Sequence, residues 1–353
     1  MKFQQKLQDR IDKGSLRSLL SFENHVDFWS NDYLGLAREV QAVALNGSTG
    51  SRLISGNSPV IEQAESGIAA HFESEAALVF NSGYDANLGL FSSLPQKGDT
   101  ILYDELVHAS VRDGIRLSFA HAFSFKHNDM EDLRKKLRKA EGTVFVAIES
   151  LYSMDGDLAP LAAISAVCKD AGALLIVDEA HSGAVFGEEG KGLCKELGIQ
   201  DSVFIRLFTF GKGYGAHGAA VCCSEQVKQF LVNFARSFIY TTALPEGMYT
   251  HVLQQINRSK SDTLRAQLQE NIAYFTRHIR SSLSSERSPV QVIEFSELEA
   301  CQSIAQQLQE SGLAVKAILP PTVPAGSQRL RICIHAFNTR EELDRLIALL
   351  ADQ

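Results

Sequence analysis

A single lysine, Lys212, stands in a glycine-rich turn between two apolar runs of the sequence. The run Leu207–Phe210 stops at Gly211, and a second apolar run, Ala219–Cys223, follows the turn. A turn between two buried strands needs only glycines, because glycine adopts the required backbone conformations without strain. A long amine at this place therefore indicates chemistry, since lysine amines form Schiff bases with carbonyl compounds.

Other polar side chains stand at or just after the ends of apolar runs that are typical of strands. Asp178 ends the run ALLIV, and His181 follows a few residues later. Glu149 ends the run VFVAI, and His108 comes just after ILYDELV. A buried carboxylate is costly unless it meets a cation or several hydrogen-bond donors. These strand ends are therefore candidates for a polar site.

One cofactor uses an amine, an aspartate and an aromatic ring at neighbouring strand ends, and that cofactor is pyridoxal phosphate. A lysine links covalently to its aldehyde, and an aspartate keeps the pyridine nitrogen protonated so that the ring withdraws electrons. Glycine-rich turns, hydroxyl groups and helix N-termini bind its phosphate. The turn NSGYDAN, at residues 81–87, and Thr209 are candidates for the phosphate site.

Each of these features also has a plainer interpretation. A strand-end aspartate can be a helix cap, a lone histidine can simply be hydrogen-bonded, and a lysine between glycines can be solvated. A nicotinamide dehydrogenase needs G-x-G-x-x-G between a strand and a helix, but Gly211–Gly215 leads into another apolar run. A P-loop needs Ser or Thr after its lysine, and glycine follows Lys212. The order of Asp178, His181 and Lys212 favours pyridoxal phosphate.

The middle of the chain alternates between strand-like and helix-like patterns. Strands are predicted over residues 100–106, 143–150, 173–179, 202–210 and 218–224. Between them, the apolar residues of 161–171 recur at helical spacing. This alternation predicts an α/β fold with a mostly parallel sheet that helices cover on both faces. Ligands of such sheets bind beyond the carboxyl ends of the strands.

The pattern changes after about residue 250, which predicts a smaller C-terminal α+β domain. A long polar helix over 259–283 precedes shorter segments at 290–294, 297–311, 330–335 and 340–351. We expect an N-terminal segment of residues 1–46, a large cofactor-binding domain of residues 47–250 and a small domain of residues 251–353.

Composition excludes several classes of protein. The 353 residues are 45% hydrophobic and 22% charged, which is typical of a globular chain long enough for two domains. A net charge of −8 argues against a nucleic-acid partner. We expect no transmembrane helix and no secretory signal, because no apolar run has the needed length. The six cysteines lack C-x-x-C spacing, so we expect reduced core residues of a cytoplasmic protein and no metal site.

The sequence resembles the α-oxoamine synthases, which are fold-type I pyridoxal-phosphate enzymes, over nearly its whole length. The resemblance rests on the blocks SNDYLGL (30–36), NSGYDANLGL (81–90), ESLYSMDGDLAPL (149–161), VDEAHSGAVFGEEGKG (177–192) and TFGKGYGAHGAAV (209–221). The stretch AILPPTVPAGSQRLRI (317–332) is similar to the members of this family that serve biotin biosynthesis. The family's fold has a large domain on a mostly parallel sheet and a smaller α+β domain.

The resemblance implies roles for the polar residues at the strand ends. It implies that Lys212 holds the cofactor covalently and later moves the substrate's α-proton. It implies that Asp178 pairs with the pyridine nitrogen, that His181 hydrogen-bonds the phenolic oxygen, and that His108 stacks on the ring. Further cofactor contacts are implied for Ser153, Thr209, Gly83 and Tyr84, and for Thr241 or Thr242 of FIYTTALP, which would reach the phosphate of the neighbouring subunit.

The resemblance also implies how substrates bind. Arg331 would bind the carboxylate of the amino acid, and Glu149 would lie near the substrate. Thr322 belongs to the PPTVP stretch that lies near the substrate carboxylate in the family. Arg17, in GSLRSLL, matches an arginine near the acyl chain or is a surface charge of a helix.

The implied reaction is a decarboxylative condensation of L-alanine with a pimeloyl thioester, carried by coenzyme A or by acyl-carrier protein. It would take place in a homodimer with shared active sites. Within the family, the alternatives are glycine with acetyl-CoA or succinyl-CoA, and serine with a long acyl chain. Outside it, a dehydrogenase would bind nicotinamide. A non-catalytic protein of this fold would have lost Lys212, Asp178 or Arg331, and all three are present.

Two features depart from the family pattern. After DYLGL the chain reaches GSTGSR (47–52) within about ten residues, fewer than is usual, which could alter how the N-terminal segment covers the acyl channel. His217 stands in the turn after Lys212, where small residues are usual. It is either a solvated loop residue or a contact to the phosphate or the thioester.

Overall fold

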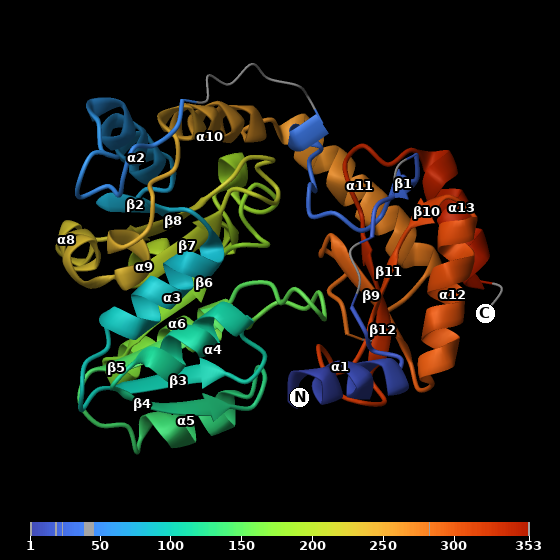
Figure 1. Cartoon of the computed structure of the whole chain (residues 1–353), viewed down its shortest axis with the longest axis horizontal. Helices are drawn as coiled ribbons and strands as arrows, with labels where there is room; N and C mark the ends of the chain where they lie inside the picture. Colours follow the sequence, from blue (N-terminus) through green and yellow to red (C-terminus); the bar gives the residue numbers. More distant parts are fainter. Residues whose placement is uncertain (1, 18–19, 23, 39–45, 282, 352–353) are drawn as a thin grey trace. The chain divides into compact units, whose positions relative to one another are not determined.

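The chain forms two compact units, whose elements can be followed in Figure 1. The structure is a computed structural model that describes residues 2–17, 20–22, 24–38, 46–281 and 283–351. The larger unit comprises residues 31–153 and 157–267, and the smaller unit comprises residues 1–30, 154–156 and 268–353. The expected divisions at 46/47 and 250/251 differ from these bounds, and the first differs because Val26–Asp27 pairs with Leu313–Ala314.

A seven-stranded sheet with the order β2-β8-β7-β6-β5-β3-β4 forms the centre of the larger unit. Its strands are β2 (Ala76–Phe80), β3 (Thr100–Asp104), β4 (His121–Phe125), β5 (Val144–Glu149), β6 (Leu174–Asp178), β7 (Ile205–Thr209) and β8 (Ala219–Cys223). Strand β8 runs antiparallel to β2 and β7, and the other pairs are parallel. The prediction of a mostly parallel sheet is confirmed, and each of the five predicted strands is present, whereas β2 and β4 were not predicted.

Helices precede, connect or follow these strands, and several begin at side chains that cap them. The helices are α2 (Pro59–His71), α3 (Gly83–Ser93), α4 (Ala109–Leu117), α5 (Met130–Leu137), α6 (Leu161–Ala171), α7 (Leu193–Glu196), α8 (Glu225–Phe234), α9 (Arg236–Ile239) and α10 (Glu246–Ser259). Helix α11 (Asp262–His278) begins in the larger unit and continues in the smaller one. Ser58, Ser82 and Ser224 accept backbone N–H groups at the starts of α2, α3 and α8. Such caps satisfy backbone donors that a helix leaves unpaired.

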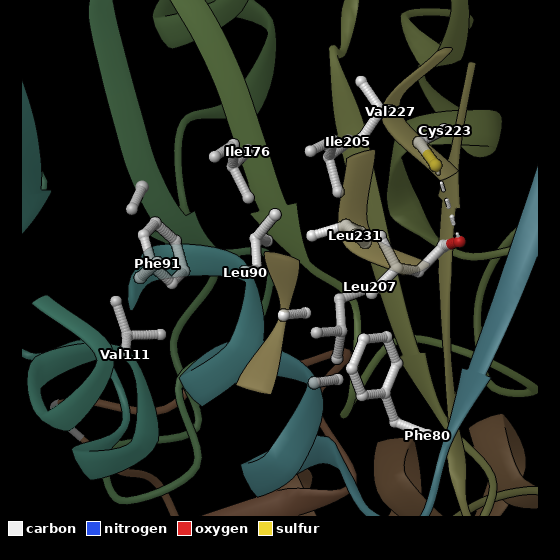
Figure 2. Packing of buried hydrophobic residues seen from close by; sticks show 14 of the residues in the cluster. Phe80, Leu90, Phe91, Val111, Ile176, Ile205, Leu207, Cys223, Val227 and Leu231 are labelled. Carbon is white, nitrogen blue, oxygen red and sulfur yellow. Dashed lines mark hydrogen bonds between the residues drawn. The ribbon is translucent and has the colours of Figure 1, made fainter. Parts of the chain in front are cut away.

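One apolar layer fixes helix α3 on the sheet. Figure 2 shows Leu90 and Phe91 projecting from α3 into the same layer as Ile176 of β6 and Leu207 of β7. All four side chains are at most 2% exposed, and burying each one contributes about 1.5–3 kcal/mol. Because α3 directly follows β2, this packing holds its N-terminus at the carboxyl edge of the sheet.

The smaller unit is α+β, as predicted. An antiparallel sheet has the order β11-β12-β9, and a parallel pair joins β1 to β10. The elements are α1 (Lys2–Asp12), β1 (Val26–Asp27), β9 (Val290–Phe295), α12 (Leu298–Glu310), β10 (Leu313–Ala314), β11 (Lys316–Ile318), β12 (Gln328–Cys333) and α13 (Arg340–Ala351). The pairing of β1 with β10 explains why the N-terminal residues belong to this unit.

Other expectations from the sequence concern the cysteines, membrane-spanning helices and the link after DYLGL. All six cysteines are buried and free, as expected of core residues. Among the described residues, no helix has the length and apolar character needed to cross a membrane. Most of the short link between DYLGL and GSTGSR, at residues 39–45, lies outside the described residues.

A buried carboxylate connects helix α2 to its surroundings. Glu65 accepts hydrogen bonds from Arg52 Nη1 at 2.8 Å and from the backbone nitrogen of Val79 at 3.0 Å. Lys228 Nζ lies 3.1 Å from the same carboxylate, whose side chain is only 1% exposed. The loop that carries Arg52, strand β2 and helix α8 therefore all depend on one charged group.

Replacing Glu65 with alanine is expected to lower the free energy of unfolding by about 3–5 kcal/mol, because it leaves Arg52 without its buried counter-charge. Denaturation in urea measures this change. The exposed Glu75→Ala variant is the control and should change the free energy of unfolding by no more than about 0.5 kcal/mol. Equal stability of the two variants would contradict the role given to Glu65.

Candidate active site

A cavity of about 310 Å³ lies in the larger unit, at the carboxyl edge of the sheet. It is lined by residues at or just after the ends of β2, β3, β5, β6 and β7, as expected for ligand sites of parallel sheets. The predicted site residues that it brings together are Gly83, Tyr84, His108, Glu149, Asp178, His181, Thr209 and Lys212. His217 also lines this cavity.

The turn that carries Lys212 needs its glycines for geometric reasons. The backbone nitrogen of Phe210 donates to Gly218 O at 2.9 Å, which closes the turn between β7 and β8. Gly215 and Gly218 have positive φ angles of +61° and +99°. A Cβ at Gly215 would lie 2.4 Å from the backbone nitrogen of Ala37. The turn thus accommodates no side chain at Gly215, while Lys212 reaches into the cavity.

His181 connects Lys212 to Tyr33. Lys212 Nζ lies 2.9 Å from His181 Nε2, and His181 Nδ1 lies 2.7 Å from Tyr33 Oη. The Tyr33 hydroxyl also lies 3.1 Å from Asn31 Oδ1, and when it donates to that atom its oxygen accepts from His181 Nδ1. This direction leaves Nε2 of His181 as the acceptor for the lysine amine.

Asp178 is held from two sides at the end of β6. Its Oδ1 atom accepts from the backbone nitrogen of Ala180 at 3.0 Å, and its Oδ2 atom accepts from Asn87 Nδ2 at 2.9 Å. The residue is only 7% exposed. Two donors offset part of the desolvation of this carboxylate, and each oxygen keeps a further lone pair toward the cavity.

His108 caps helix α4 with its own ring. Its Nδ1 atom accepts from the backbone nitrogen of Ser110 at 3.2 Å and lies 2.7 Å from Ser110 Oγ. The residue lines the cavity and is exposed. Burial is the main cause that lowers the pKa of His108. The charge of Asp178 raises this pKa, and the charge of Lys212 lowers it further.

Glu149 is a buried carboxyl group beside Asp178. The two residues lie opposite each other in the pairing of β5 with β6, and Glu149 is 4% exposed. Its Oε1 atom accepts from the backbone nitrogen of His108 at 2.6 Å. Burial, and then the charge of Asp178, raise the pKa of Glu149 to about 8. At neutral pH this cavity therefore contains a protonated glutamic acid next to an aspartate.

The start of helix α3 offers a cradle for an anion. Ser82 caps the helix, and a Cβ added at Gly83 would lie 2.5 Å from Thr209 Cγ2, so a larger residue there would require the Thr209 side chain to move. Thr209 donates its hydroxyl to Ala180 O at 3.3 Å. The Tyr84 hydroxyl donates to Asp113 Oδ2 at 2.5 Å, so it is already engaged on the surface of the unit.

Three residues predicted to contact the cofactor are not among those that line the cavity in the described chain. Ser153 lies partly buried in the turn after β5. Asn81 Nδ2 donates to Thr241 Oγ1 at 3.2 Å and to Thr242 O at 2.9 Å. Because Asn81 directly precedes the cap of α3, these threonines lie beside the turn that offers the anion cradle.

The other predicted substrate residues belong to the smaller unit. Arg331 lies on β12, is 8% exposed, and donates from Nη1 to Cys333 Sγ at 3.1 Å. Arg17 donates from Nη2 to Thr322 Oγ1 at 2.9 Å. Arg17 and Thr322, which were predicted separately from the sequence, are thus hydrogen-bonded to each other.

Asn87, Ser110 and Tyr33 line or support the cavity, although no sequence pattern predicted a role for them. Asn87 and Tyr33 stand inside the quoted blocks NSGYDANLGL and SNDYLGL. A signal was available for Asn87, because it is one turn from Leu90 and Phe91 and so shares their apolar helix face. A polar residue on such a face requires a buried partner.

The chain matches known proteins over most of its length. The family model for aminotransferase class I and II matches residues 23–350. An 8-amino-7-oxononanoate synthase of Emericella nidulans is 39% identical over 384 aligned positions, which cover 98% of this chain and 93% of that protein.

Two solved structures resemble the chain closely. An 8-amino-7-oxononanoate synthase of Francisella tularensis superposes with a TM-score of 0.80 at 29% identity, covering 94% of this chain and 98% of that one. A serine palmitoyltransferase from S. paucimobilis was solved with a bound PLP–myriocin aldimine. It superposes with a TM-score of 0.90 at 26% identity, covering 99% of this chain and 96% of that one. These matches show a fold-type I aminotransferase-like fold.

The raised pKa of Glu149 predicts how stability depends on pH. The pKa of about 8 in the folded chain exceeds the ordinary value of 4.5. The contribution of Glu149 to stability is therefore complete below pH 4.5 and is lost as the pH rises through 8. The free energy of unfolding of the ligand-free protein should therefore fall over this window, relative to Glu149→Gln, by a few kcal/mol (on the order of 1.4 per pKa unit). Urea titrations at several pH values measure the difference, and parallel curves would contradict the shift.

Proposed function

Because this chain belongs to the aminotransferase class I and II family and, within it, to the 8-amino-7-oxononanoate synthases, we propose that it condenses L-alanine with a pimeloyl thioester. The products are 8-amino-7-oxononanoate, CO2 and the free thiol, in a step of biotin biosynthesis. One observation carries the proposal at the level of the site: Lys212, His181 and the buried Asp178 lie in one cavity at the ends of β6 and β7.

The cavity fits pyridoxal phosphate by the chemistry of its groups. It combines a lysine amine, a buried carboxylate for a ring nitrogen, and a helix start where glycine leaves room for a phosphate. When bound, this cofactor supplies a ring that stabilises negative charge on the α-carbon of the substrate. The relatives support this choice, since the serine palmitoyltransferase structure carries a PLP adduct.

Each residue at the strand ends then has its own role. Lys212 supplies the amine that holds the cofactor and afterwards moves the α-proton of alanine. His181 accepts the hydrogen bond of Lys212 and so orients that amine. Asp178 carries the negative charge that keeps a ring nitrogen protonated, and His108 presents its exposed ring face as a stacking surface.

The phosphate and the substrates use the remaining predicted residues. Gly83 and Thr209 shape the phosphate site at the start of α3, with Ser153 and Tyr84 as further contacts. Glu149, which is protonated at neutral pH, can donate a hydrogen bond inside the cavity. Arg331 binds the carboxylate of the amino acid, whereas Arg17 and Thr322 bind the acyl substrate as one hydrogen-bonded pair.

The active form is proposed to be a homodimer in the cytoplasm. Tyr240 is 71% exposed directly before Thr241 and Thr242, and Ile54 and Phe119 of the same unit are 84% and 83% exposed. A large apolar side chain exposed directly beside these threonines is consistent with a surface that a partner covers. A second copy would let Thr241 or Thr242 reach the phosphate of the neighbouring site. The six buried, free cysteines fit a reducing compartment.

A serine palmitoyltransferase activity is the second candidate, because a structure of that enzyme superposes with a TM-score of 0.90. The two candidates share the cofactor and the bond-forming step, but they differ in the amino acid and in the length of the acyl chain. The greater sequence identity to the synthase of Emericella nidulans favours alanine and pimelate.

The choice of substrates can be tested directly. We expect the protein loaded with pyridoxal phosphate to release thiol and to form 8-amino-7-oxononanoate when L-alanine and pimeloyl-CoA are supplied. Mass spectrometry detects the product, and the same assay with pimeloyl-acyl-carrier protein identifies the preferred carrier. Turnover with L-serine and palmitoyl-CoA, but not with alanine and pimeloyl thioesters, would replace the proposed reaction by the second candidate.

Replacing Lys212 with alanine should lower the turnover number by more than about 100-fold, because no other group supplies the amine that moves the proton. The variant should still retain pyridoxal phosphate through the phosphate site, which equilibrium dialysis measures. Lys97→Ala, an exposed lysine of the same unit, is the control and should keep full activity. Undiminished turnover in Lys212→Ala would remove the lysine from the mechanism.

A further inference from the structure

We propose that Asn87 is a positioning residue whose side-chain amide fixes the Asp178 carboxylate and, through Ser110, the protonation pattern of His108. The inference rests on the proposed function and deepens it, because Asp178 and His108 are the groups that would face the cofactor ring. One buried amide would then control both Asp178 and His108.

Asn87 occupies a place where the packing would favour an apolar residue. It lies on α3, one turn before Leu90 and Phe91, which enter the apolar layer of Figure 2. The residue is 3% exposed and lines the cavity. A buried amide is unfavourable unless its hydrogen bonds are satisfied, so its contacts show what it does there.

Both hydrogens of the Asn87 amide are used. Nδ2 donates to Asp178 Oδ2 at 2.9 Å and to Ser110 Oγ at 3.0 Å. The opposite orientation of the amide would point its oxygen at a carboxylate oxygen, where neither atom has a hydrogen to donate. Asp178 therefore selects the orientation of Asn87, and Asn87 in turn fixes the position of one carboxylate oxygen.

Ser110 passes this orientation on to His108. Because its hydroxyl oxygen accepts from Asn87, its hydrogen is available for His108 Nδ1 at 2.7 Å. The backbone nitrogen of Ser110 donates to the same ring atom at 3.2 Å. A ring nitrogen that accepts two hydrogen bonds carries no proton, so neutral His108 has its hydrogen on Nε2. The lowered pKa of His108 agrees with this neutral form.

Neither aspartate, leucine nor serine would provide both functions. Aspartate would place a second carboxylate about 3 Å from Asp178, where like charges repel. Leucine would fit the apolar face but would leave Asp178 with the backbone nitrogen of Ala180 as its remaining donor in the described contacts. Serine retains one hydroxyl hydrogen and cannot donate to two acceptors at once.

The first test needs no substitution at Asn87. ¹⁵N NMR of the histidine rings, with His108 assigned by loss of its signals in His108→Gln, reports the protonation of each ring nitrogen. In the wild-type protein without cofactor, we expect unprotonated Nδ1 and protonated Nε2 at pH 7. A proton on Nδ1 would overturn the proposal, whether or not any variant folds.

The second test separates the two connections of Asn87. Asn87→Ala should weaken the binding of pyridoxal phosphate by about tenfold or more, because Asp178 loses a charge-assisted hydrogen bond, and it should alter the ring signals of His108. Ser110→Ala should alter those signals and weaken the cofactor less than Asn87→Ala does, because Asp178 keeps its bond from Asn87. Ser93→Ala, on the same helix, is the matched control for both readouts. Wild-type affinity and ring signals in Asn87→Ala would contradict the proposal.

Failure of this inference differs from failure of the proposed function. The His108 signals of the cofactor-free protein report the hydrogen-bond chain whatever the substrates are. The predicted ring signals without any condensation of alanine and a pimeloyl thioester would leave the role of Asn87 in place and remove the proposed reaction. Condensation with a proton on Nδ1 of His108 would do the reverse.

Discussion

The hydrogen-bonded carboxylate of Asp178 is the constraint on which the rest of the site depends. A charged group at the buried end of β6 is stable only where donors surround it. The backbone turn to Ala180 supplies one donor, and the amide of Asn87 supplies another. Helix α3 must therefore sit on the sheet in one register, which its apolar side chains Leu90 and Phe91 enforce.

The parallel arrangement of the strands brings the other groups to the same edge. Glu149, Asp178 and Thr209 end β5, β6 and β7, and Lys212 follows in the next turn. Each group then changes the chemistry of its neighbours: Asp178 helps to raise the pKa of Glu149, and Lys212 helps to lower that of His108. The glycines of the turn allow the lysine to enter this arrangement, because a side chain at Gly215 would collide with Ala37.

Sequence patterns predicted the parts of the fold that local apolarity determines. The strands β5, β6 and β8 are nearly continuous apolar runs, as expected for strands buried on both faces, and β3 and β7 are mostly apolar. Strand β4, at the edge of the sheet, alternates with exposed residues, and β2 is rich in alanine, which also suits helices. The pairing of β1 with β10 joins residues that are distant in the sequence, so no local pattern could place the first thirty residues in the smaller unit.

The site shows the same division between local and long-range information. Residue types at strand ends identified Lys212, Asp178, His181 and His108, because chemistry at parallel strand ends follows from topology. The contacts of Asn87 with Asp178 and Ser110 join three separate segments, and only the folded chain reveals them.

The central claim is that Lys212 is the amine that holds pyridoxal phosphate in this cavity. The most direct measurement is reduction of the cofactor-loaded protein with borohydride, followed by proteolysis and mass spectrometry of the peptides. The account predicts a pyridoxyl group on Lys212 in the peptide that contains the glycine-rich turn. A reduced cofactor on another lysine, with Lys212 unmodified, would contradict it.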